Sequence, residues 1–176
     1  DAQVTLYQGN NWVQSFGVSA ATPGAVAPFT LAAGTYRIDI EASGGNGVNY
    51  ALRLRDFAGA SAVTANVGVV DALVPGAAAI YKFEAQAGQR LYYTPTDLGG
   101  LRGQWTLYNE FGAQIQTGDS AQAQTLYRLP RGGAYYFVWD SLADSSHAAS
   151  PVPFSFTLSN TPVATPTALA IGSTVQ

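Results

Sequence analysis

The chain has 176 residues, with 8 lysines and arginines against 11 aspartates and glutamates, for a net charge of −3. It contains no cysteine and no methionine, which excludes disulfides, thiolate metal sites and cysteine nucleophiles. The basic residues are scattered from Arg37 to Arg131. This argues against binding to nucleic acid or anionic membranes, both of which need a concentrated basic surface.

Alanine, glycine, threonine, serine, tyrosine and valine dominate the composition, and only 11% of residues are charged. Such a composition is typical of an extracellular β protein. No apolar run approaches the roughly 20 residues of a membrane helix, so we expect no membrane insertion. The chain opens at Asp1 inside a strand-like pattern, and we expect a processed or partly observed product that is secreted or displayed on the cell surface.

Alternating apolar and polar residues, bounded by turn residues, predict a series of short antiparallel strands rather than helices. Glycine, proline and asparagine clusters such as residues 43–47 and 130–133 separate them. Short strands at this spacing predict an all-β sandwich. In chain order, the expected strands are 3–8, 34–41, 49–56, 66–73, 79–85, 89–94, 104–109, 124–129, 133–140 and 153–159.

The sequence also contains an internal similarity with a period of about 100 residues. The four matched pairs are residues 4–7 with 105–108, 34–36 with 133–135, 50–54 with 154–158, and 67–68 with 171–172, at offsets of 101, 99, 104 and 104. Four ordered matches at nearly one spacing predict tandem repeats of one supersecondary unit.

Aligning the copies divides the chain into three parts. Residues 61–161 form one complete unit, residues 1–60 form the C-terminal part of a preceding unit, and residues 162–176 form a linker and the opening strand of a following unit. The segments 59–65 and 161–167, rich in alanine, serine, threonine and proline, are expected to be short connectors.

Residues 80–93, 105–109, 129–135 and 154–158 together resemble bacterial pre-peptidase C-terminal domains. The resemblance covers 61–161 and, through the internal repeat, most of the remaining chain. It implies antiparallel, jelly-roll-like β-sandwiches that occur beside secreted proteases and as tandem copies in very large surface proteins. Some relatives bind calcium or collagen, so the resemblance also raises calcium as a ligand.

The acidic residues give little support to a calcium site. They are dispersed, no Asp-x-Asp-x-Asp-Gly loop exists, and Asp140 with Asp144 is the nearest approach to a cluster. Imidazole-based metal sites need more than the single His147. We therefore expect no cofactor, while a calcium ion held by carbonyls and a carboxylate stays open.

Catalysis would need a nucleophile, a base and an orienting group within mutual reach. The candidates are His147, in the loop 141–147, and the segment Gly118-Asp119-Ser120, which is similar to a serine-hydrolase element but lacks the following glycines. An ordinary solvated loop and an ordinary turn explain both. We predict that the protein is not an enzyme.

The aromatic residues divide into core and surface by strand alternation. Tyr36, Ile38 and Ile40 should face inward, as should Tyr135, Phe137 and Trp139 in the matching strand, and Trp105 joins this inward set. On the outward side, three charged residues of the first copy (Arg37, Asp39 and Glu41) are replaced by Tyr136, Val138 and Asp140. An apolar outer face of this kind predicts a partner-binding surface at Tyr136 and Val138.

Trp12 lies in the stretch Asn10-Asn11-Trp12, which we predict to be a loop, and it is the tryptophan with the most freedom to bind a partner or a glycan. The tail 167–176 has the pattern of an opening strand. Added to the exposed sheet edge of another copy, it would give head-to-tail polymers.

The function these features favour is a non-catalytic structural or adhesive repeat module of a large bacterial surface protein or fibre, whose partners are neighbouring repeats. The alternative is a carbohydrate- or protein-binding accessory domain of a secreted hydrolase or protease. Flanking copies of the unit would favour the first, and a flanking catalytic domain the second.

Overall fold

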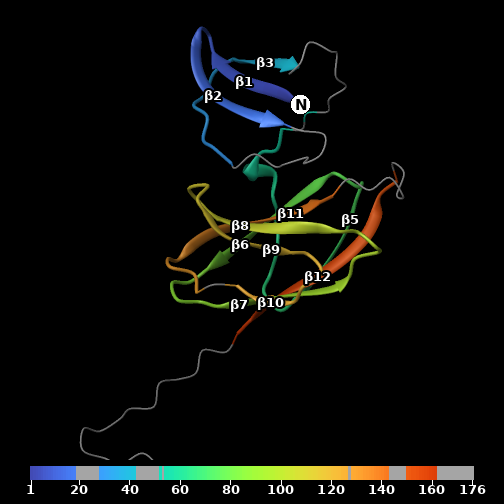
Figure 1. Ribbon diagram of the computed structural model, residues 1–176. Helices are drawn as coiled ribbons and strands as arrows, with labels where there is room; N and C mark the ends of the chain where they lie inside the picture. The colour runs from blue at the N-terminus through green and yellow to red at the C-terminus, as the bar shows by residue number, and fades with distance from the viewer. Residues whose placement is uncertain (19–27, 43–51, 53, 127, 143–149, 162–176) are drawn as a thin grey trace, which may run out of the picture.

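A computed structural model describes residues 1–18, 28–42, 52, 54–126, 128–142 and 150–161. In these residues the fold is built from strands, with a single 3-10 turn, and the predicted all-β antiparallel sandwich is confirmed. Figure 1 shows a small sheet, which contains the N-terminus, beside a larger two-layered sandwich. Within this described part, no helix has the length and apolar character that a bilayer span requires.

The small sheet has three strands in the order β2-β1-β3. Its strands are β1 (Ala2–Gln8), β2 (Asn11–Val18) and β3 (Tyr36–Ala42). All neighbours are antiparallel. A tight turn at Gly9, whose φ is +60°, joins β1 to β2, because glycine adopts this left-handed backbone without strain.

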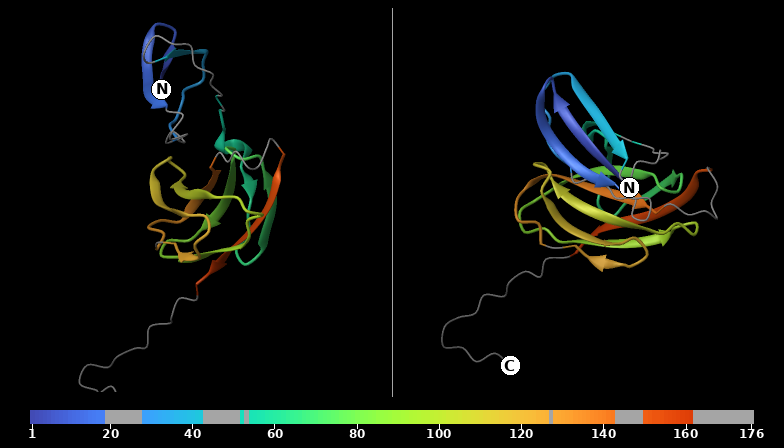
Figure 2. Two further views of the ribbon diagram at one scale, coloured as in Figure 1. Left: turned by 45° about the vertical axis from the view of Figure 1, so that its right-hand side comes forward. Right: turned by 45° about the horizontal axis from the view of Figure 1, so that its top comes forward.

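The sandwich packs a five-stranded sheet against a four-stranded one (Figure 2). The five-stranded sheet has the order β4-β6-β11-β8-β9 and consists of β4 (Ser61–Ala62), β6 (Ala78–Ala85), β11 (Gly133–Ser141), β8 (Gly103–Asn109) and β9 (Gln114–Asp119). The four-stranded sheet has the order β10-β7-β12-β5 and consists of β10 (Gln124–Thr125), β7 (Leu91–Asp97), β12 (Val152–Asn160) and β5 (Gly68–Leu73). All neighbours are antiparallel except β4 and β6, which are parallel.

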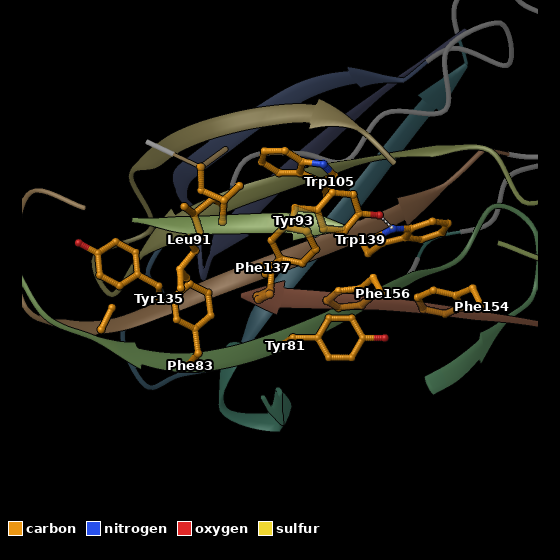
Figure 3. Close-up of a cluster of buried hydrophobic side chains, with 14 of the residues drawn as sticks. Tyr81, Phe83, Leu91, Tyr93, Trp105, Tyr135, Phe137, Trp139, Phe154 and Phe156 are labelled. Atoms are coloured by element: carbon orange, nitrogen blue, oxygen red, sulfur yellow. Dashed lines mark hydrogen bonds between the residues drawn. The ribbon is translucent and has the colours of Figure 1, made fainter. Parts of the chain in front are cut away.

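The aromatic core lies between the two sheets of the sandwich (Figure 3). Trp105, Phe137 and Trp139 are fully buried, and Tyr135 is nearly so, as alternation along the strands predicts. From the opposite sheet, Phe156 lies 5.4 Å from the Phe137 ring, within the range of favourable ring pairs. The prediction that Trp105 is a core residue is confirmed.

Tyr93 carries the polar contacts at the centre of this core. Its hydroxyl donates to the carbonyl of Ser120 at 2.7 Å and accepts from Trp139 Nε1 at 3.3 Å. Burial raises the pKa of Tyr93 to about 12; the hydrogen bond with Trp139 opposes the rise and the charge of Asp119 adds to it. The neutral phenol is therefore the form that this site stabilises.

We expect the protein to lose about 2 kcal/mol of unfolding free energy between pH 10 and pH 12 through Tyr93. The folded pKa lies above the unfolded value, so this stabilisation is complete below pH 10 and disappears as the pH rises toward 12. Urea unfolding across this range should show a shallower decline for Tyr93→Phe than for the wild type. The exposed Tyr92→Phe is the control, and equal slopes for both variants would contradict the assignment.

Several strand predictions need correction. The segment 49–56 is not a strand in its described residues (52 and 54–56), the strand expected at 124–129 shrinks to β10, and Trp12 lies in β2 rather than in a loop. Strands β2 and β9 were not predicted. Both are edge strands, and their mixed, glutamine-containing sequences lack a clean alternation because only one neighbouring strand and part of one face bury them.

Candidate functional site

The outer face of the five-stranded sheet is covered in part by the chain segment that leads into the sandwich. We call residues 54–60 the connector; they precede most of the connector predicted at 59–65, in which Ser61 and Ala62 form β4. A 3-10 turn, η1 (Phe57–Gly59), forms in it because the Asp56 side chain caps the turn by accepting from the backbone N–H of Ala58 at 2.9 Å. The cap directs Phe57 onto the sheet.

Phe57 stacks on Tyr136 with ring centroids 4.3 Å apart, and its ring lies tilted against that of Tyr108 with centroids 6.0 Å apart. Beneath these rings, Val138 is buried with Ala78 in a small apolar cluster that is separate from the main core. The predicted partner surface at Tyr136 and Val138 is therefore occupied by the connector of the same chain. Binding of an external partner at Tyr136 and Val138 stays a prediction. Such a partner would contact the part of Tyr136 that Phe57 does not cover.

Two charged residues, Asp140 and Arg55, form a border at one side of this cluster. Burial raises the pKa of the Asp140 carboxyl and the nearby Arg55 guanidinium lowers it, with the rise dominant. Burial also raises the pKa of Tyr108. Next to them, an open pocket of about 290 Å³ is lined by Arg55, Asp56, Gly59, Ser61 and residues 78–80.

The structure describes one of the two candidate metal residues. Asp140 lies at this border, while Asp144 lies outside the described residues. Among the described residues, no three histidine, cysteine, aspartate or glutamate side chains gather as a metal would require. A calcium ion at Asp140 and Asp144 stays a prediction.

The structure describes the candidate nucleophile segment but not the candidate base. His147 lies outside the described residues. Asp119 Oδ1 accepts from the backbone N–H of Ala121 at 2.8 Å, which makes it a turn residue. Ser120 is buried, and its Oγ has no hydrogen-bond partner, so no base reaches it within the described chain. This segment closes the end of β9 and presents no activated nucleophile.

Trp12 belongs to a second surface, the outer face of the small sheet. Its side chain is 62% exposed. It stands opposite Tyr7, and Tyr7 stands opposite Arg37, so one row crosses all three strands. The Arg37 guanidinium lies 4.6 Å from the centroid of the Tyr7 ring and forms an ion pair with Asp39 at 3.0 Å.

Sequence reasoning missed Phe57, although one signal was present. Asp56 followed by Phe57 fits an N-capping residue ahead of a short turn. The segment instead fitted a strand pattern, because Leu52, Leu54 and Asp56 alternate with arginines. Leu54 is 80% exposed, which contradicts that alternation.

We expect Phe57→Ala to lower the unfolding free energy by about 1–3 kcal/mol, because the stacked ring pair contributes roughly 1 kcal/mol and the partly buried side chain adds its apolar burial. Its larger effect should be on the connector, which loses its anchor and becomes a site of faster proteolysis. Limited digestion followed by mass spectrometry measures the cleavage rate between residues 54 and 60. Phe111→Ala, which removes an aromatic ring that is 69% exposed, is the matched control, and equal cleavage of the two variants would argue against anchoring.

No protein-family model matches the chain, and no curated protein matches its sequence. Among solved structures, it is similar to PliG of Aeromonas hydrophila, a periplasmic lysozyme inhibitor of g-type lysozyme, with a TM-score of 0.48 and 15% identity over 58% of this chain and 96% of that one. It is also similar to the pre-peptidase C-terminal domain of collagenase from Bacillus anthracis, with a TM-score of 0.46 and 15% identity over 61% and 99%. PliG of Salmonella Typhimurium matches with a TM-score of 0.44 and 14% identity over 57% and 97%. These values say nothing about an activity or a ligand, so the geometry of the chain itself has to support the function.

Proposed function

We propose that the chain is a non-catalytic, extracellular structural module in which sandwich units follow one another, each joined to the next by an anchored connector. The small sheet is the C-terminal part of one unit, and the sandwich at 61–161 is a whole unit. The observation that carries this proposal is a match in strand register between the small sheet and one side of the sandwich.

The order β2-β1-β3 corresponds to β9-β8-β11. Leu6 pairs with Ile38 as Leu107 pairs with Phe137, which keeps the offsets of 101 and 99 seen in the sequence. The hairpin partners also agree, because the β1/β2 register shifts between Leu6 and Tyr7, and the β8/β9 register shifts between Leu107 and Tyr108. A bulge at the same place in both hairpins is a specific feature, since a bulge re-aims every side chain beyond it.

Two hydrogen bonds repeat as well. The Tyr36 hydroxyl donates to the carbonyl of Ala32 at 2.6 Å, and the Tyr135 hydroxyl donates to the carbonyl of Arg131 at 2.9 Å, each four residues back. A hydroxyl pair crosses each hairpin: Ser15 donates to Thr5 at 3.1 Å, and Thr106 and Thr117 lie 3.3 Å apart. Local geometry, hydrogen bonds and sequence offsets thus support one repeated unit.

The small sheet differs from its counterpart in what covers it. In the sandwich, β6 pairs with the outer edge of β11, whereas the corresponding edge of β3 has no strand partner among the described residues. Ile38 and Ile40 are half-buried, while their counterparts Phe137 and Trp139 are fully buried under the second sheet. The small sheet therefore has the edge and the apolar face that a further strand pair would cover.

The connector supports a structural role. Phe57 fixes the residues just before the sandwich to its outer face, so the chain enters the sandwich in one direction. Surface charge is sparse, and the most perturbed titratable groups serve packing. Tyr81, for example, buries its ring in the core while its hydroxyl donates to the half-buried Asp71 at 2.8 Å. These features favour scaffolding or adhesion over catalysis.

The test is to complete the small sheet. A copy of residues 61–101 placed ahead of Asp1 restores the counterparts of β4 to β7, because Arg102 corresponds to residue 1. We expect the backbone amides of β3 that face away from β1 to exchange with deuterium at least about tenfold more slowly. The urea m-value should rise with the added buried surface.

The control carries the same extension with Tyr81 and Phe83 of the copy replaced by aspartate, which prevents the added strand from burying its inner face. Exchange in β3 should then equal that of the wild type. If the intact extension leaves β3 exchange unchanged, the small sheet is not part of such a unit and the proposal fails.

A further inference from the structure

The outer face of the small sheet holds an aromatic ring in a fixed orientation. Trp12 Nε1 donates to Ser15 Oγ at 2.8 Å, and Ser15 Oγ donates to Thr5 Oγ1 at 3.1 Å. The bulge in β2 makes the first bond possible, because Val13 is the extra residue that brings Trp12 and Ser15 onto one face. The indole is therefore held by its own N–H while 62% of the side chain stays exposed.

The corresponding face in the sandwich is the outer face of β8 and β11, and part of the same chain covers it. There, Tyr108, Tyr136 and Val138 form an apolar patch under Phe57. On the small sheet, the positions of Tyr136 and Val138 are held by Arg37 and Asp39.

Charged residues at these positions do not suit an apolar ring from a connector. Trp12, however, stands opposite Tyr7, where the sandwich has Gln114 opposite Tyr108. Compared with the sandwich face, the small sheet thus has one more aromatic side chain beside more polar neighbours. A ligand that fits this face is therefore apolar on one side and rich in hydroxyl groups at its rim.

A pyranose ring has this chemistry. Its axial C–H groups form an apolar face that stacks on an indole, and its equatorial hydroxyls both donate and accept hydrogen bonds. Arg37 Nε and Nη2 donate to the two carboxylate oxygens of Asp39 at 3.0 and 3.1 Å, which leaves three N–H donors and the remaining lone pairs of both oxygens for a ligand, with no net charge. The neighbouring Glu41 is exposed and negative, which disfavours an anionic sugar.

We propose that the outer face of β2-β1-β3 binds an uncharged pyranose unit of a polysaccharide, stacked on Trp12 and hydrogen-bonded at Arg37 and Asp39. The prearranged indole reduces the ordering cost of binding. A single platform predicts weak, millimolar affinity that rises with the number of sugar units or of attached copies. This site is independent of the module proposed above, which the exchange of β3 amides tests separately.

Intrinsic fluorescence isolates the site, because Trp105 and Trp139 are fully buried and iodide can reach only Trp12. The probes are the hexasaccharides of β-1,4-glucose, β-1,4-N-acetylglucosamine, β-1,4-mannose and α-1,4-glucose at millimolar concentration. We expect at least one of them to reduce the iodide quenching constant about twofold, since stacking covers one face of the ring. Saturation-transfer difference NMR of the same probe should give sugar signals.

The variants separate the platform from general effects. Trp12→Ala should abolish the sugar signals and Trp12→Tyr should retain them in part, while Phe111→Ala removes another exposed aromatic ring and should leave them unchanged. Circular dichroism verifies that each variant is folded.

Equal sugar signals from Trp12→Ala and the wild type would overturn the proposal, as would the absence of binding by all four probes. A peptide of residues 52–62 that protects Trp12 when no sugar does would assign the face to the connector of another copy and overturn it as well.

Discussion

Replacing Phe137 with alanine is expected to lower the free energy of unfolding by about 3–5 kcal/mol, the usual cost of removing a fully buried phenylalanine. The ring lies 5.5 Å from Tyr93 and 5.3 Å from Trp105, in addition to its contact with Phe156 in the opposite sheet. One substitution therefore loosens both sheets at once. A loss of this size is a large part of the stability of an ordinary domain.

Urea unfolding followed by circular dichroism measures this loss, and Ile38→Ala is the matched control. Ile38 is the counterpart of Phe137 in the small sheet, but it is half-buried, so truncation leaves a smaller cavity. A loss for Phe137→Ala that is no greater than the loss for Ile38→Ala would contradict the assignment of Phe137 to the centre of the core.

The second large effect is expected at Gly118, which stands opposite Trp105 in the β8/β9 hairpin. A Cβ at Gly118 would lie 2.7 Å from Trp105 Cε2 and would also meet the side chain of Gln124. Gly118→Phe should therefore destabilise the sandwich by more than about 3 kcal/mol, beyond the usual range for overpacking. Trp105→Val should cost a similar amount by leaving a cavity, although it also removes an indole N–H that has no partner.

Combining the two changes should recover part of the loss. The small sheet has this arrangement already, because Val4 stands opposite Phe16 at the same place in its hairpin. We expect a favourable coupling of about 1–3 kcal/mol in a double-mutant cycle measured by urea unfolding. Additive effects would mean that the side chains at positions 105 and 118 do not compete for one space, as the comparison with Val4 and Phe16 predicts that they do.

The aromatic strands were predictable because each buries one face completely. Phe137 and Trp139 alternate with partly exposed or outer-face neighbours, and period-two alternation is the strongest sequence signal for a strand. The edge strands β2 and β9 lacked this signal, since an edge position leaves Gln14 and Gln116 partly accessible. Trp12 was expected to be exposed, but its strand and its bond to Ser15 depend on a bulge that alternation cannot reveal.

The anchored connector could not be predicted from the sequence, for a different reason. The apolar Val138 on a predicted outer face indicated only that something would cover it. That the cover is Phe57 depends on a cap at Asp56 and on a path of the chain in three dimensions. The spacing of residues in a sequence predicts local secondary structure. It does not predict where a short turn packs on a distant strand, because that depends on tertiary contacts.

The reciprocal sizes of Val4 with Phe16 and Trp105 with Gly118 have a consequence for folding on the ribosome. Neighbouring units with similar strands are prone to misassembly, because a strand of one can pair inside the other. Strand β8 inserted beside β2 would place Trp105 against Phe16, two bulky rings where the space holds one. Strand β1 inserted beside β9 would leave a void at Gly118. The mismatch favours each nascent strand pairing with its own hairpin partner.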